Sequence, residues 1–221
     1  MSINAIYSAT GKFYTTTEGR TVPSAGMICT TLAKESYDYV GIESLERAMQ
    51  EGEGAHRVAC DYSLTWLGHL NDVVLPLVPE GHLHSEESWT TAMLHALNQV
   101  KLLFAQYAVE PIAVEQPSIC SLYGFGGQPD LKCWMRWRGQ RICAVWDYKR
   151  VRALALAHAL KMECYRLLDG YQDCQSAFIA WLQKDGKPIL RHMPINQRYK
   201  AAICGQAAAF NFQISERLLI P

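Results

Sequence analysis

The sequence lacks the marks of a secreted or membrane protein. Its 221 residues contain no apolar run close to the roughly 20 residues that a membrane-spanning helix requires. The first residues, Met1-Ser2-Ile3-Asn4-Ala5-Ile6, show neither the basic start nor the long apolar segment of a secretion signal. We therefore expect a cytoplasmic location and no membrane partner.

Closely spaced cysteines are also missing. The chain has eight cysteines, but no two of them form a C-x-x-C pair, and several fall in apolar segments. Disulfide frameworks and zinc sites need more regular spacing than this. We therefore expect free, buried thiols.

The chain has no excess charge of either sign, because 21 basic residues balance 21 acidic ones. A strongly basic total would be the usual footprint of a nucleic-acid-binding protein. The distribution is more informative: between residues 131 and 166 there are nine basic residues against two acidic ones. Positive charge therefore gathers in one part of the chain.

Internal repeats, low-complexity tracts and a convincing linker are absent, so we expect one α/β domain over residues 1–221. Periodicity and turn residues predict a helix over 41–70 with a break at the glycines of 51–54, and a second helix over 89–107. They also predict strands over 112–122, 131–137 and 141–146, with a turn at 138–140. A helix over 152–168, strands over 176–183 and 188–194, and a helix over 199–215 complete the expected order. Residues 1–110 are thus expected to be mainly helical, and 111–221 to form an αβ core.

Four charged residues interrupt the apolar strands of this core: Glu115, Asp130, Asp147 and Lys149. An uncompensated charge there would cost several kcal/mol. Asp147 and Lys149 are two residues apart, so their side chains share one face of a strand, while Trp146 and Tyr148 share the other. The short turn at 138–140 makes the strands after Asp130 and before Lys149 antiparallel neighbours.

These strand ends therefore predict one site with three carboxylates and an amine. Oxygen ligands of this kind suit Mg²⁺ or Mn²⁺, and a lysine beside them can position or activate an attacking water.

The ordered set Glu115, Gly127-Gln128-Pro129-Asp130 and Asp147-Tyr148-Lys149 resembles the signature of the PD-(D/E)xK nuclease superfamily. The resemblance implies a restriction-endonuclease-like core, which is a central mixed β-sheet flanked by helices, behind a helical N-terminal portion. Glu115, Asp130, Asp147 and Lys149 would be the catalytic residues.

Further segments resemble RecB-type and phage exonucleases of this superfamily. Gly52-Glu53-Gly54-Ala55-His56 is similar to a glycine-histidine helix whose histidine is a metal ligand, and Val22-Pro23-Ser24 is similar to an opening found in phage exonucleases. Lys161 and Tyr165 match a Q-x-x-x-Y motif, with lysine in place of glutamine.

The resemblance implies a DNA exonuclease that uses one or two Mg²⁺ or Mn²⁺ ions in a bacterial or phage-infected cell. The implied metal ligands are His56, Glu115, Asp130, Asp147 and the backbone carbonyl of Tyr148. The implied DNA contacts are Arg150, Arg152, Lys161 and Tyr165. Cys164, Cys174 and Cys204 are too far apart for the iron–sulfur cluster of some relatives, so we expect none.

Other functions stay open at this stage. One alternative is a non-cleaving nucleic-acid-binding or assembly protein on the same fold, and another is a nuclease for RNA or for CRISPR-adaptation intermediates. The resemblance also leaves room for an oligomer and for a recombination or single-strand-binding partner protein, neither of which the sequence specifies.

Attack from DNA ends is expected for two reasons. The chain shows no zinc finger or helix-turn-helix to read base sequence. Acidic residues of the N-terminal portion could also repel a continuous duplex and leave a narrow basic passage: Glu35, Asp38, Glu43, Glu46, Glu51 and Glu53.

Overall fold

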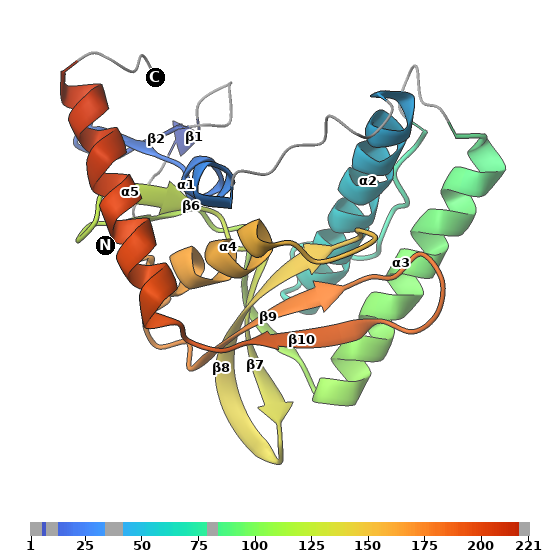
Figure 1. Ribbon diagram of the computed structural model, residues 1–221. Coiled ribbons are helices and arrows are strands. Elements are labelled where there is room, and N and C mark those ends of the chain that lie inside the picture. Colours follow the sequence, from blue (N-terminus) through green and yellow to red (C-terminus); the bar gives the residue numbers. More distant parts are fainter. Residues whose placement is uncertain (1–5, 8–12, 34–41, 79–83, 217–221) are drawn as a thin grey trace.

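A central five-stranded mixed sheet organises the protein (Figure 1). The computed structural model describes residues 6–7, 13–33, 42–78 and 84–216. The strands lie in the order β10, β9, β8, β7, β4, with β8 and β9 parallel and the other neighbours antiparallel. Their bounds are Glu110–Val114 for β4, Leu131–Trp137 for β7, Gln140–Lys149 for β8, Ser176–Trp181 for β9 and Ile189–Met193 for β10. The α/β class and the central mixed sheet are as the sequence predicts.

The β7–β8 hairpin closes through Arg138 and Gly139, which have φ values of 50° and 81°. Two consecutive residues with positive φ are typical of the type I′ turn, whose twist matches that of the flanking strands. The turn sets a register in which Trp137 pairs with Gln140 and Leu131 with Trp146. Asp130 thus comes directly before the paired region, at the same edge of the sheet as Asp147.

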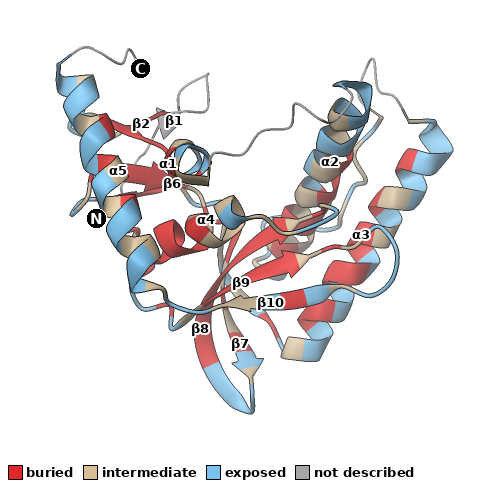
Figure 2. Cartoon of the chain, in the orientation of Figure 1, coloured by how far each residue is buried: buried red, intermediate tan, exposed pale blue. Residues whose placement is uncertain are grey.

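Helices cover both faces of the sheet (Figure 1). Helices α2 (Ile42–Trp66) and α3 (Glu86–Tyr107) bury one face, where Trp146 and Tyr148 of β8 lie in the same core as Met93 and Phe104. Helices α1 (Ala25–Ala33), α4 (Leu156–Leu167) and α5 (Gln197–Ser215) bury the other. The middle of β8 is buried on both faces, as Figure 2 shows, so its sequence is apolar without alternation.

Helices α1, α2 and α3 make up most of the described N-terminal portion, but it begins with strands that the sequence did not indicate. A small sheet comes first, made of β1 (Ile6–Tyr7), β2 (Phe13–Thr15) and β3 (Thr21–Pro23). It adjoins a second small sheet of β5 (Ser118–Cys120) and β6 (Phe125–Gly127), and a Cβ atom on Gly126 would lie only 2.4 Å from the Tyr14 ring. Glycine at 126 therefore serves close packing between two segments that lie far apart in the sequence.

The predicted strand over 112–122 is two strands in different sheets. β4 pairs with β7 and β5 pairs with β6. Between them Glu115 adopts a left-handed backbone with φ of 47°, which turns the chain out of the central sheet. The turn leaves Glu115 beside the edge of the sheet rather than within it.

The predicted break at 51–54 does not occur, because α2 runs through both glycines. A Cβ atom on Gly54 would lie 2.6 Å from the Trp89 ring and 2.8 Å from the Met93 sulfur. Glycine at 54 lets α2 approach α3 closely and is not a helix stop.

Helix α4 begins at Leu156, later than the sequence indicated. None of the helices in the described part of the chain combines the length and the apolar character that crossing a membrane requires.

Candidate metal centre

Separate elements bring four of the predicted residues, His56, Glu115, Asp130 and Lys161, to one pocket of about 260 Å³. Helix α2 supplies His56, the turn after β4 supplies Glu115, and the residue before β7 supplies Asp130. Helix α4 contributes Lys161 and Tyr165 to the wall. The pocket is lined by Tyr14, Ser24, Ala25, Gly26, His56, Glu115, Gly127, Gln128, Asp130, Lys161 and Tyr165.

His56 and two carboxylates form one side of the centre. The His56 Nε2 atom lies 3.1 Å from Asp130 Oδ1 and 4.0 Å from Glu115 Oε1. Burial alone would lower the pKa of His56, but the hydrogen bond and charge of Asp130, with the charge of Glu115, raise it from its ordinary value. Burial raises the pKa of Glu115, and the Asp130 charge adds to that rise while His56 opposes it.

Asp130 is held in place by the neighbouring strand. The Tyr148 backbone N–H donates to Asp130 Oδ2 at 2.6 Å, and the Glu115 N–H donates to the Asp130 carbonyl at 3.1 Å. One carboxylate oxygen is therefore fixed to β8 while the other faces His56. The sequence-based expectation that Asp130 meets the end of the Asp147 strand is realised in these contacts.

Asp147 lies on the other side of the centre and is fully buried. Lys149 Nζ lies 2.5 Å from Asp147 Oδ2, and Lys161 Nζ lies 3.1 Å from Oδ1. Burial would raise the pKa of Asp147, but the two ammonium groups outweigh burial and hold that pKa well below its usual range. Lys149 approaches Oδ2 outside hydrogen-bond geometry, so this oxygen has a charge contact but no aligned donor.

The donor set fits a hard divalent cation. Three carboxylates offer oxygen ligands, one buried carboxylate oxygen lacks an aligned donor, and an imidazole adds a nitrogen that Mn²⁺ accepts. The Tyr148 carbonyl, a predicted ligand, lies at the same strand end, where it accepts from Lys149 Nζ at 3.1 Å. His56, Glu115, Asp130, Asp147 and the Tyr148 carbonyl remain the predicted ligands of such an ion.

Cys60 is a neighbour that sequence reasoning missed. Its sulfur lies 3.7 Å from His56 Nε2, and the two residues are four apart on α2, a spacing that places them on one helix face. Burial and the nearby carboxylates raise the pKa of the Cys60 thiol well above its ordinary value. Without a bound ion the thiol therefore stays protonated, and its sulfur lies with ligand atoms of His56 and Glu115 in a group whose atoms are all within 4.8 Å of one another.

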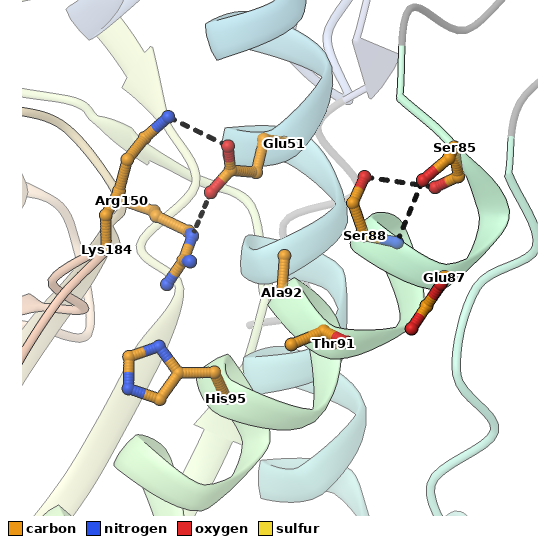
Figure 3. Close-up of a pocket in the computed structure, with 9 residues that line it drawn as sticks. All are labelled: Glu51, Ser85, Glu87, Ser88, Thr91, Ala92, His95, Arg150 and Lys184. Atoms are coloured by element: carbon orange, nitrogen blue, oxygen red, sulfur yellow. Dashed lines mark hydrogen bonds and ion pairs between the residues drawn. The ribbon is translucent and has the colours of Figure 1, made fainter.

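Arg150, a predicted DNA contact, lies elsewhere. Its guanidinium is buried, with Nε 2.6 Å from Glu51 Oε1, and it donates to the Gln183 carbonyl. Lys184 reaches the other Glu51 oxygen at 2.8 Å. These residues line a separate pocket of about 490 Å³ between α2, α3 and the β9–β10 connection (Figure 3). Arg152 is exposed.

Glu51 also bears on the expected acidic barrier. Its charge is buried between Arg150 and Lys184, so it does not face a passing duplex. Glu43, Glu46 and Glu53 are exposed on α2, whereas Glu35 and Asp38 lie outside the described residues.

All eight cysteines are free and seven are buried, as predicted. Cys143 and Cys174 approach each other, with sulfur atoms 3.6 Å apart and Asp173 beside them. Both Asp173 oxygens already accept from Lys132 Nζ, at 2.7 and 2.9 Å. This cluster therefore lacks a free carboxylate for a cation.

Comparison with known proteins gives only distant similarity. No family model matches the sequence, and no curated protein matches it. One similar solved structure is a "Putative exonuclease" from Eubacterium rectale, with 13% identity, a TM-score of 0.43, and coverage of 90% of this chain and 77% of that one. Another is SSO0001, with 13% identity, a TM-score of 0.31, and coverage of 85% and 84%.

Replacing Glu51 tests the role assigned to Arg150. We expect Glu51→Gln to lower the free energy of unfolding by roughly 3 kcal/mol, because it leaves a buried guanidinium without its counter-charge. Urea denaturation measures the change. Glu53→Gln is the matched control, since Glu53 is exposed on the same helix. Equal stability of the two variants would contradict a structural role for the Glu51–Arg150 pair.

Replacing His56 tests its role as a ligand. We expect His56→Ala to weaken Mn²⁺ binding by at least about tenfold and to leave DNA affinity without metal nearly unchanged. Calorimetric titration with Mn²⁺ and fluorescence anisotropy with DNA in EDTA separate the two effects. His69→Ala, at an exposed position near the end of α2, is the control. A Mn²⁺ titration curve identical to that of the unmodified protein would show that His56 only packs.

Proposed function

We propose that the protein is a divalent-metal-dependent deoxyribonuclease of the PD-(D/E)xK superfamily, similar to RecB-type and phage exonucleases. The observation that carries the proposal is the convergence of His56, Glu115 and Asp130 on the strand end that bears Asp147 and Lys149. These residues come from four segments of the sequence, and two carboxylates from separate segments face the same imidazole.

The chain's own residues would position the reacting groups. His56, Glu115, Asp130, Asp147 and the Tyr148 carbonyl would hold Mg²⁺ or Mn²⁺. Such an ion supplies Lewis acidity that polarises a phosphate and lowers the pKa of a bound water. The Lys149 ammonium, fixed by Asp147 and the Tyr148 carbonyl, would orient the attacking water or stabilise the negative charge that develops on the phosphate.

DNA is the partner that the surrounding charge favours. Lys161 faces the pocket, Tyr165 lines it, and Arg152 is exposed near the start of α4. Basic side chains of this kind bind the phosphate backbone without reading base sequence. Arg150 is left out of this contact set because its guanidinium is engaged by Glu51.

Two substitutions test the catalytic assignment. We expect Asp130→Ala and Lys149→Ala each to reduce Mg²⁺-dependent cleavage of DNA by at least about 100-fold, since each removes a group that acts on the reacting atoms. Circular dichroism checks that the variants are folded. Lys132→Ala is the control, because Lys132 also extends from a strand but pairs with Asp173 away from the centre. Near-normal cleavage by either test variant would refute the assignment.

The proposal also specifies that the protein cleaves DNA from its ends. We expect the protein to degrade linear DNA and largely to spare covalently closed circles, because Glu43, Glu46 and Glu53 place exposed negative charge on the helix that carries His56. The assay compares supercoiled, nicked and linear DNA, single-stranded DNA and RNA, with Mg²⁺, Mn²⁺ or EDTA. Nicking of circles as fast as shortening of linear fragments would exclude an exonuclease. DNA binding without cleavage in any metal would favour a non-cleaving nucleic-acid-binding protein. Preferential cleavage of RNA would favour a nuclease that acts on RNA.

A further inference from the structure

Lys161 occupies an unusual place in the centre. Its ammonium group lies 3.1 Å from Asp147 Oδ1 and 5.2 Å from the centroid of the Tyr165 ring, one turn further along α4. The side chain keeps 29% of its surface exposed and lines the pocket together with His56, Glu115 and Asp130. Lys161 therefore brings a fixed positive charge into the space where cations would bind.

The positive charge is distributed unevenly across the centre. On the α4 side, Asp147 has two ammonium groups, because Lys149 lies at Oδ2 and Lys161 at Oδ1. On the α2 side, Glu115 and Asp130 share only the imidazole of His56 as an ion-pair partner within the described residues. A divalent ion on the α4 side would face two like charges at short range, whereas one on the α2 side would face a carboxylate pair.

We propose that the Lys161 ammonium takes the place of a second metal ion, so that the centre binds a single divalent cation on the His56–Glu115–Asp130 side. This inference rests on the proposed function and specifies its metal requirement. Asp147 stays ion-paired at both oxygens, with Lys161 at Oδ1 and Lys149 at Oδ2, so His56, Glu115 and Asp130 are the main ligands left for the single ion. Lys161 adds a positive charge toward a bound phosphate without itself requiring a metal.

The test measures how many Mn²⁺ ions bind, without DNA and without activity. Calorimetry and electron paramagnetic resonance count the Mn²⁺ bound by the unmodified protein, Lys161→Gln and Lys161→Arg. We expect one ion for the unmodified protein and for Lys161→Arg, which keeps the charge. For Lys161→Gln we expect a second ion, or binding of the first that is tighter by about tenfold or more.

Each other result overturns the inference. Two Mn²⁺ ions in the unmodified protein would overturn the inference and leave the nuclease proposal intact. This measurement does not depend on the folding of a variant. One ion with unchanged affinity in all three proteins would also overturn the inference. No bound Mn²⁺ together with no metal-dependent cleavage would instead remove the proposed function itself. Asp130→Ala serves as the reference for loss of the ion on the α2 side.

Discussion

The buried charge of Asp147 constrains the structure more than any other single group. A carboxylate without solvent exposure on a central strand would cost several kcal/mol without counter-charges. One counter-charge comes from Lys149 on the same strand, and the other comes from Lys161 on α4. Helix α4 connects β8 to the parallel strand β9, so the connection that the sheet topology requires also delivers the second lysine. The ion pair and the sheet topology therefore depend on each other.

Local chemistry explains why the sequence predicts this part of the fold correctly. The Arg138-Gly139 turn and the alternating burial of β7 define the hairpin without reference to the rest of the chain. Once the hairpin is set, the two-residue period of a strand places Asp147 and Lys149 on one face, and the register brings Asp130 to the same edge. The candidate carboxylates and their lysine could thus be found from sequence because their geometry follows from short-range rules.

The features that the sequence does not predict depend on contacts between distant segments. A glycine such as Gly54 often marks the end of a helix, but here the closeness of the Trp89 ring explains why position 54 has no side chain. Glu115 leaves its strand through a left-handed backbone that no residue pattern indicates for glutamate. The sequence predicts Lys161 only as a DNA contact. Its contact with Asp147 follows from the packing of α4 on the sheet. For Gly54 and for Lys161 the deciding atom belongs to another element.

Lys149 and Arg150 link the centre to the stability of the fold. They are adjacent, and their side chains meet different partners: Lys149 reaches Asp147 on the α4 side, while Arg150 reaches Glu51 of α2. The Lys149 carbonyl also accepts from the Leu182 N–H at 2.7 Å. The end of β8 is therefore held by helix layers on both faces and by the strand beside it. Such support keeps a charged strand end from fraying, and it keeps the lysine in place before any phosphate arrives, as catalysis by preorganised charge requires.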